Sequence, residues 1–186
     1  MSTKVVTGKV RFSYVHIFEP QEQQGGGDPR YGVTLLIPKS DTATLGKIKE
    51  AMAEARENFC KRNGASALPA KPNHTLHDGD GTRDSGDPFG PECKDCWVIT
   101  VNSKNKPIIV DAFRNPITDA LEVYSGCYGR ASINFYGYNR NGKKGISAGL
   151  LSIQKLTDGD PLGGSMGSAD DFDDGFSDGA ADDDWM

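Results

Sequence analysis

The amino-acid sequence predicts a mainly β domain with one amphipathic helix, followed by a disordered C-terminal tail. Three observations lead to this fold class. Several long segments alternate apolar and polar residues in the manner of half-buried strands. One segment carries apolar residues at helical spacing. The last 25 residues contain eight aspartates and no lysine or arginine, so they bury too little apolar surface to offset the entropy of ordering.

Charge is divided unequally between these two parts. Residues 1–155 hold 21 Lys and Arg against 16 Asp and Glu, whereas residues 156–186 hold ten Asp and no basic residue. The net charge of −5 therefore hides a basic domain, and a basic domain attracts polyanions. We expect a folded domain at residues 1–156 and the tail at residues 157–186. An acidic tail on the same chain can compete for the basic face.

The end of the tail has the composition of a peptide hook. Its last residues are Asp182, Asp183, Asp184, Trp185 and Met186. The aromatic residue offers an apolar anchor, and the acids before it offer charge to a basic pocket on a partner. We interpret this segment as a partner-binding site.

Several functional classes find no support in the sequence. The N-terminus lacks an apolar signal core, and no run approaches the length of about twenty apolar residues that crosses a bilayer, so we expect a cytoplasmic protein without a membrane partner. No GxxxxGK[ST] phosphate loop is present. The calcium-like start Asp78-Gly79-Asp80-Gly81 has Phe89 where a bidentate Glu is needed. We expect no enzymatic activity.

The first third of the chain predicts two strands. Residues 4–18 alternate, with Val10, Phe12 and Tyr14 on one side and Lys9 and Arg11 on the other, which indicates a long strand with a basic face. Residues 21–30 form a glycine-rich turn. Residues 31–37 form the second strand, which ends at Pro38.

The helix follows this second strand. Ser40 or Asp41 is expected to cap it, and Asn63-Gly64 to end it after about Arg62. Its apolar face is spaced by three and four residues and consists of Leu45, Ile48, Met52, Ala55 and Phe59.

Residues 65–95 form an irregular segment that contains a candidate zinc site. His74-x-x-His77 and Cys93-x-x-Cys96 have the ligand types and the pair spacing of a tetrahedral site that pins a loop. The alternative is that the cysteines are ordinary loop thiols and that the protein uses no cofactor. Four cysteines are too few and too unevenly spread for a disulfide framework.

The last part of the domain predicts four strands. Residues 97–102 and 107–113 are the first two, and residues 124–138 and 145–155 form a hairpin around Asn141-Gly142, a pair that tolerates a tight turn. In the hairpin's first strand, Ala131, Ile133 and Phe135 form a core face.

The opposite face of that strand combines aromatic, basic and small polar residues. Bases of single-stranded nucleic acid stack on rings and guanidinium groups meet phosphates, so we interpret this face as a binding site. Its members are Tyr128, Arg130, Tyr136 and Tyr138, with Arg140, Lys143 and Lys144 in the turn and with Lys9, Arg11, Trp97, Lys104, Lys106 and Arg114 as extensions. The alternative is that the tyrosines are simply good strand formers with a polar tip.

This combination resembles the single-stranded DNA-binding proteins of tailed bacteriophages. The resemblance is carried by the run Tyr124-Ser125-Gly126-Cys127-Tyr128-Gly129-Arg130 before an aromatic strand, the later Gly145-Ile146-Ser147-Ala148-Gly149-Leu150 strand, and the acidic tail with an aromatic tip. It covers most of residues 1–155. Trp185-Met186 departs from the proline-phenylalanine ending of the bacterial type.

The resemblance implies an OB-fold, a small antiparallel barrel with a groove for single strands. It implies sequence-independent protection of DNA in phage replication, recombination and repair within the host cytoplasm, with the tail recruiting replication or recombination proteins. Two other hypotheses stay open: a protein-interaction or virion accessory domain without nucleic-acid binding, and a zinc-dependent nuclease. The sequence leaves homo-oligomerisation open.

Overall fold

Alternating apolar side chains build a barrel from strands that lie far apart in the sequence. The computed structural model describes residues 2–22, 27–83, 86–140 and 142–162, so most of the expected tail lies outside the described residues. Within them, one sheet contains β1 (Lys4–Val6), β2 (Val10–Gln21), β3 (Arg30–Pro38), β4 (Asn73–His74), β5 (Leu76–Asp78), β6 (Cys96–Ser103), β7 (Ile108–Val110), β8 (Tyr128–Arg140) and β9 (Lys143–Thr157), accompanied by α1 (Thr42–Asn63) and a single 3₁₀ turn, η1 (Pro91–Cys93).

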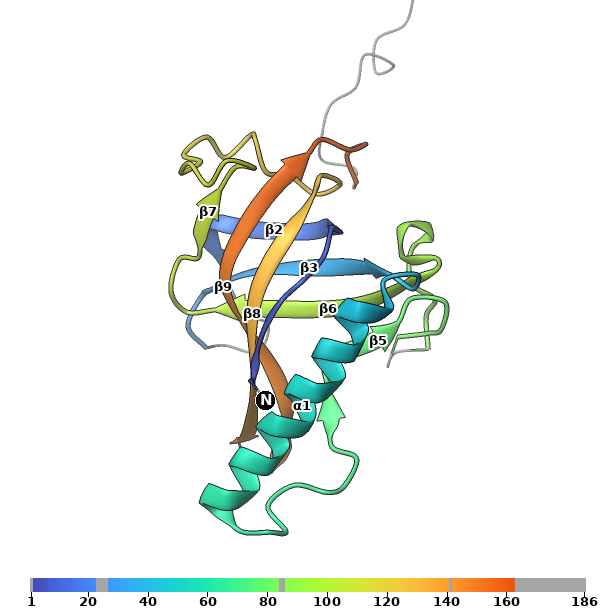
Figure 1. Cartoon of the computed structure of the whole chain (residues 1–186), viewed down its shortest axis with the longest axis vertical. Helices are drawn as coiled ribbons and strands as arrows, with labels where there is room; N and C mark the ends of the chain where they lie inside the picture. The colour runs from blue at the N-terminus through green and yellow to red at the C-terminus, as the bar shows by residue number, and fades with distance from the viewer. Residues whose placement is uncertain (1, 23–26, 84–85, 141, 163–186) are drawn as a thin grey trace, which may run out of the picture.

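Five of these strands close into a ring. β2 pairs antiparallel with β3, and β3 with β6. β6 meets β9 in parallel at Asn102 and Gly149, β9 pairs antiparallel with β8, and β8 returns to β2. Figure 1 shows β8 and β9 crossing over β2, β3 and β6. In chain order the ring runs first, second, third, fifth, fourth, which is the connectivity of an OB-fold and confirms the expected fold class.

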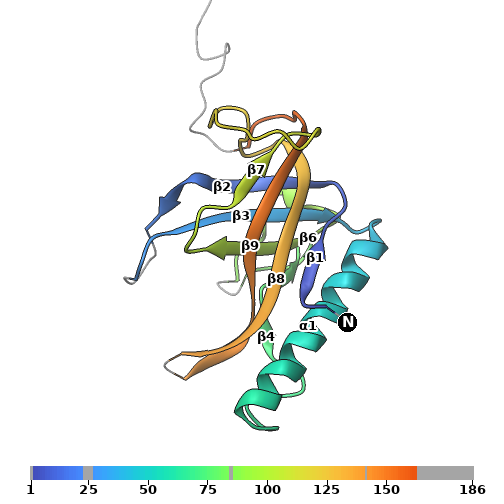
Figure 2. The same ribbon diagram turned by 60° about the vertical axis from the view of Figure 1, so that its left-hand side comes forward.

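The core fills the interior of this ring, and α1 packs against it. Its largest fully buried side chains include Phe12, Leu35, Ile37, Ile99, Ile133 and Phe135. The helix lies beside β1 in Figure 2, packs its Phe59 side chain against Gly137 of β8, and buries Ile48, Ala51 and Ala55. Among the described residues no helix has the length and apolarity needed to span a membrane.

Asp41, and not Ser40, caps the helix, because its carboxylate accepts a hydrogen bond from the backbone N–H of Thr44 at 3.1 Å. Contacts with this helix N-terminus also divide the single strand expected at residues 4–18 into β1 and β2. Gly8 donates its N–H to Thr44 Oγ1 at 2.9 Å, and a Cβ on Gly8 would lie 2.5 Å from Asp41 Oδ2. The chain therefore leaves the sheet between β1 and β2 to pass over the helix N-terminus.

Other element boundaries also differ from the sequence-based expectation. The irregular segment 65–95 contains β4, β5 and η1. The strand expected at residues 107–113 shortens to β7, because the carboxylate of Asp111 accepts hydrogen bonds from the N–H groups of Phe113 and Asn115 and turns the chain. The hairpin strand begins at Tyr128 and not at Tyr124.

Candidate nucleic-acid interface

A β-bulge in β2 turns Tyr14 outward. The pairing of β2 with β3 shifts register between Ser13 and His16, and Tyr14 adopts a φ of 48°, which is uncommon for a residue other than glycine. Tyr14 is 59% exposed. The expectation that Tyr14 shares a side with the buried Phe12 is therefore wrong, because the bulge inserts a residue and reverses the alternation there.

The outer face of β2, β3 and β6 forms a groove beside this tyrosine. A hollow of about 310 Å³ is lined by Ser13, Tyr14, Thr34, Leu36, Val98 and Thr100 from the strands, and by His77, Arg83, Phe89 and Cys93 from the segment around β5 and η1. A second hollow shares Tyr14, Thr34 and Thr100 and adds residues that include His16, Arg30, Tyr31 and Asn102. We call these two hollows together the β3–β6 groove.

Strand register produces a polar line across the floor of the groove. Ser13 pairs with Thr34, and Thr34 pairs with Thr100. The hydroxyl groups of Thr34 and Thr100 are 3.3 Å apart. Next to this line, Leu36 and Val98 form a small apolar cluster with Cys93, separate from the main core.

One wall of the groove presents an aromatic ring and a cation. The guanidinium carbon of Arg83 lies 4.7 Å from the centroid of the Phe89 ring, and the His77 ring lies 6.3 Å from the same ring. Phe89 packs against the apolar cluster of Leu36 and Val98. A ring on an apolar floor next to a guanidinium group is suited to stacking a base and to contacting its phosphate.

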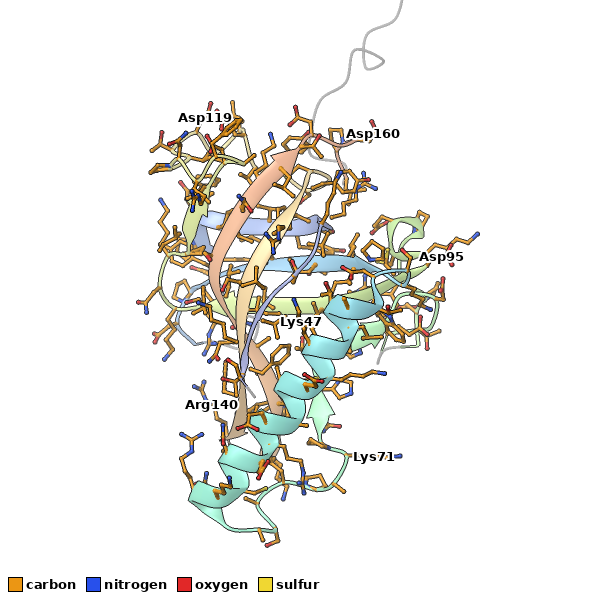
Figure 3. The ribbon with its side chains drawn as sticks, viewed as in Figure 1. Lys47, Lys71, Asp95, Asp119, Arg140 and Asp160 are labelled. Atoms are coloured by element: carbon orange, nitrogen blue, oxygen red, sulfur yellow. The ribbon has the colours of Figure 1, made fainter. Side chains whose placement is uncertain are left out.

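The groove continues toward the tip of the β8–β9 hairpin. A further hollow shares His77 and is lined by Asn73, His74, Thr75 and Tyr138, and the next shares Asn73 and Tyr138 and adds Lys71, Lys143 and Lys144. We call these two hollows the hairpin extension. Lys71 and Arg140 lie toward the same end of the molecule in Figure 3, with Asp119 and Asp160 toward the other.

Part of the sequence-predicted face lies along the track formed by the β3–β6 groove and the hairpin extension. Tyr138, Lys143 and Lys144 line the hairpin extension. Arg140 pairs with Lys143 at the turn. Tyr136 lies beside Gly149.

Another group of predicted residues clusters where the described chain ends. Lys9 Nζ and Arg11 Cζ lie 5.3 and 5.5 Å from the centroid of the Tyr128 ring. Arg11 also donates to the carbonyl oxygens of Gly126 and Asp160, at 3.1 and 2.6 Å. Residues 159 and 160, within the expected tail, thus lie against Tyr128 and Arg11.

Leu162 brings the base of the tail to the groove. Its N–H donates to the carbonyl oxygen of Ser125 at 2.8 Å, and its side chain packs against the Leu36 and Val98 cluster. It lines a hollow together with Ser13 and Tyr14. Leu162, within the expected tail, therefore lies next to the β3–β6 groove.

The remaining predicted residues do not line the hollows that form the track. Arg130 donates from Nε to the carbonyl oxygen of Thr7 at 2.8 Å. Trp97 packs against the main core with Lys39 Nζ 5.0 Å from its ring centroid. The other three, Lys104, Lys106 and Arg114, lie outside the strands. Lys106 Nζ lies 5.6 Å from the centroid of the Phe18 ring, and Arg114 has a φ of 69°.

Sequence reasoning missed most of the groove. Tyr14, His16, Arg30, Tyr31, Arg83 and Phe89 were not expected to act together. A usable signal existed in the OB-fold itself, because such barrels bind oligonucleotides on their second and third strands, which here are β3 and β6.

The candidate zinc site is not formed by this arrangement. No three His, Cys, Asp or Glu side chains within the described ranges gather into a group that could hold a metal ion. His74 pairs with Ile146 of β9, whereas Cys93 is buried against Leu36 and Val98. Burial raises the pKa of the Cys93 and Cys96 thiols.

Comparison with known proteins places the chain among phage proteins. Residues 3–186 match the family described as the ssDNA-binding protein of Enterobacter phage Enc34. Protein p50 of Acyrthosiphon pisum secondary endosymbiont phage 1 is 33% identical over 178 residues, which are 92% of this chain and 93% of p50.

Solved structures agree with this match. The single-stranded DNA-binding protein from bacteriophage Enc34, in complex with ssDNA, is similar with a TM-score of 0.76 and 30% identity over 87% of this chain and 90% of that chain. The single-stranded DNA-binding protein gp2.5 of bacteriophage T7 has a TM-score of 0.60 and 13% identity, and the match covers 95% of this chain and 98% of that one. At this identity, the likeness to gp2.5 shows the fold alone.

Proposed function

Because this chain belongs to the family of the single-stranded DNA-binding protein of Enterobacter phage Enc34, we propose that it binds single-stranded DNA in the β3–β6 groove and along the hairpin extension. The family match also confirms the resemblance seen in the sequence. The observation that supports this site most directly is the outward-turned Tyr14 beside a groove on the second and third barrel strands.

The lining of the groove suits sequence-independent binding. Tyr14 and Phe89 offer rings for stacking, which every base can use. Arg83 at the wall and Arg30 near Asn102, to which it donates at 3.0 Å, offer charge for phosphates. In the hairpin extension, Lys71, Lys143 and Lys144 supply further positive charge. In this proposal the bases of the single-stranded DNA lie on rings and hydroxyl groups, while the basic side chains contact its phosphates.

Fluorescence anisotropy with a labelled oligo-dT strand at several salt concentrations tests the proposal. Affinity should fall with salt, because phosphate contacts release counterions, and each contact adds about 0.7 to the slope of log K against log salt for a single strand. Arg30→Ala and Arg83→Ala should each lower that slope, whereas Lys47→Ala, on the exposed face of α1, should leave it unchanged.

Three results would refute binding of single-stranded DNA in the groove. Preference for duplex DNA, or affinity independent of salt, would contradict the stacking and phosphate contacts. Absence of binding to single-stranded DNA would favour the alternative of a protein-interaction or virion accessory domain.

We further propose that the protein coats DNA during phage replication, recombination and repair in the host cytoplasm, as a binder and not as a catalyst. In this proposal residues 1–156 form the DNA-binding domain and residues 157–186 the tail, whose last five residues recruit replication proteins. A chain without residues 182–186 should bind oligo-dT normally but lose its stimulation of a phage DNA polymerase on a primed single strand. Equal stimulation by both chains would refute the recruitment role.

A further inference from the structure

Two acidic residues lie in the chain between His77 and Arg83, which both line the proposed DNA groove. Asp78 ends β5, and Asp80 follows it in the chain that leads to Arg83 and Phe89 in the groove wall. By charge alone, carboxylates at this place should repel phosphates and weaken binding. Their hydrogen bonds indicate a different role.

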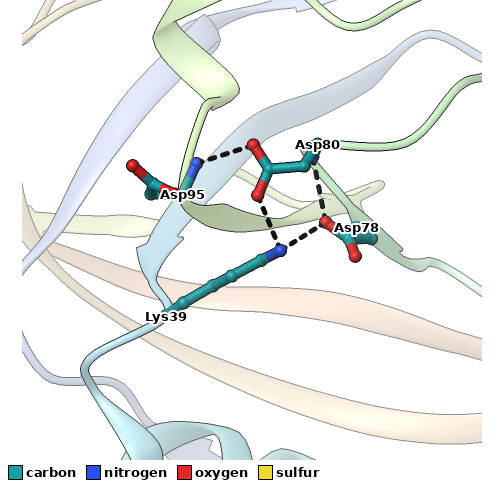
Figure 4. A network of polar contacts seen from close by, with 4 residues as sticks. All are labelled: Lys39, Asp78, Asp80 and Asp95. Atoms are coloured by element: carbon teal, nitrogen blue, oxygen red, sulfur yellow. Dashed lines mark hydrogen bonds and ion pairs between the residues drawn. The ribbon is translucent and has the colours of Figure 1, made fainter.

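Lys39, the residue after β3, joins these two carboxylates. Its Nζ lies 2.7 Å from Asp78 Oδ1 and 2.7 Å from Asp80 Oδ2 (Figure 4). Asp80 Oδ1 accepts a hydrogen bond from the N–H of Asp95 at 3.0 Å, and the N–H of Lys39 donates to the carbonyl oxygen of Asp95 at 2.9 Å. Lys39 is therefore joined to both ends of the segment 80–95, through its ammonium group to Asp80 and through its backbone N–H to Asp95. We call Lys39, Asp78 and Asp80 the Lys39 clamp.

Backbone contacts close the neck of the same segment. Gly79 donates its N–H to the carbonyl oxygen of Cys96 at 2.9 Å. A Cβ on Gly79 would collide with the carbonyl oxygens of Cys93 and Cys96. The two ends of the segment are therefore in direct contact, so that a shift of one end moves the other.

The segment tied by the clamp carries the wall of the groove. Arg83 donates its N–H to the carbonyl oxygen of Asp87 at 2.7 Å, and its guanidinium carbon lies 4.7 Å from the centroid of the Phe89 ring. Phe89 in turn packs on Cys93 and its apolar cluster. The positions of Arg83 and Phe89 thus depend on where Asp80 and Asp95 are held.

We propose that the Lys39 clamp positions Arg83 and Phe89 for single-stranded DNA, so that Lys39, Asp78 and Asp80 are positioning residues and not DNA contacts. This inference rests on the proposed function of the groove. Hydrogen bonding to Lys39 also holds the pKa of both carboxyls below their usual range, so that the clamp stays charged at neutral pH.

Replacement of one clamp carboxylate separates positioning from simple charge. If Asp80 acts only through its charge, Asp80→Asn should strengthen binding to oligo-dT, because a repulsive group is lost. If the clamp positions the wall, Asp80→Asn should weaken binding roughly fivefold to tenfold, part of the effect of losing one stacked base. Asp78→Asn should act in the same direction. Glu57→Gln, which breaks the exposed 3.3 Å ion pair with Lys61 on α1, is the matched control and should leave affinity unchanged.

The salt slope separates positioning from a direct phosphate contact by Lys39. Lys39→Met should weaken binding but keep the slope of log K against log salt, whereas loss of a phosphate contact lowers the slope by about 0.7. Lys39→Arg should retain most of the affinity. Trp97 supplies a readout without DNA, because Lys39 lies over its ring: in a Trp185→Phe background, Asp80→Asn should change Trp97 emission.

Each outcome decides the proposal. Weaker binding by Asp80→Asn with an unchanged salt slope, in a variant that unfolds at the wild-type temperature, supports the clamp. Unchanged or stronger binding by both Asp80→Asn and Asp78→Asn overturns it, as does a lowered slope in Lys39→Met. If the unmodified chain fails to bind oligo-dT, the proposed function itself fails, which is a distinguishable result.

Discussion

Replacing Tyr14 by Gly and by Ala tests the bulge and the groove together. Tyr14 holds a left-handed backbone at φ 48°, a conformation that costs a residue with a Cβ about 1–2 kcal/mol and glycine almost nothing. The residue is 59% exposed, so about two-fifths of its surface of about 200 Å² is buried, worth about 2 kcal/mol. Both variants lose this burial, but only Gly also relieves the backbone.

The expected order of stability is therefore reversed from the usual one. Tyr14→Gly should unfold with a free energy about 1 kcal/mol higher than Tyr14→Ala, whereas in an ordinary strand glycine is less stable than alanine by about 0.5–1 kcal/mol. Denaturant unfolding followed by circular dichroism measures this difference. If Tyr14→Ala is the more stable variant, the left-handed bulge is refuted.

The same two variants should bind DNA equally poorly. Loss of one stacked base costs about 1–3 kcal/mol, which corresponds to roughly 5-fold to 150-fold weaker affinity. Anisotropy titration with oligo-dT measures the loss, and Phe113→Ala, which removes an aromatic ring that is 83% exposed in the turn after β7, is the control. Affinities within twofold of the unmodified chain for both Tyr14 variants would remove Tyr14 from the binding site.

Three further predictions concern the tail, the core and the clamp. Deleting residues 162–186 should raise affinity for oligo-dT, chiefly at low salt where charge is least screened; equal affinity would leave the tail a recruitment segment alone. Gly137→Ala should lower the free energy of unfolding by about 1–3 kcal/mol, because the added Cβ would lie 2.6 Å from the Phe59 side chain of α1. Gly46→Ala is the control: open space surrounds Gly46 in the helix, so this change should raise the free energy of unfolding by up to about 1 kcal/mol. Since the clamp carboxyls have lowered pKa values, Trp97 emission in Trp185→Phe should stay constant from neutral pH down to about 3.9, the ordinary Asp pKa, and change only below it; a transition near pH 5 would contradict the ion pairs.

The candidate site was predictable where it follows a single strand. The alternation of β8 separated the buried Ile133 and Phe135 from the outward Tyr136 and Tyr138, because successive strand residues point to opposite faces. The basic residues Arg140, Lys143 and Lys144 were identified from the composition of the hairpin turn. These positions need no information beyond their own segment.

The β3–β6 groove was not predictable in this way. Tyr14 departs from the alternation through a bulge that depends on pairing with β3. Phe89 and Arg83 lie in a segment without regular alternation, where local sequence does not specify direction. The zinc hypothesis failed for a related reason, since pair spacing cannot show whether His74 and Cys93 meet.

The sequence by itself determined the β-rich domain, its helix and most of the core, because these depend on the local periodicity of apolar residues. It also determined the division of charge between a basic body and an acidic end. Only the tertiary structure decided which outward side chains become neighbours. Thr34 meets Thr100 through strand register, and Lys39 meets Asp78 and Asp80 across the end of β3. Alternation states whether a side chain points in or out, but the pairing of distant strands sets what lies beside it, and the proposed DNA groove consists of such pairings.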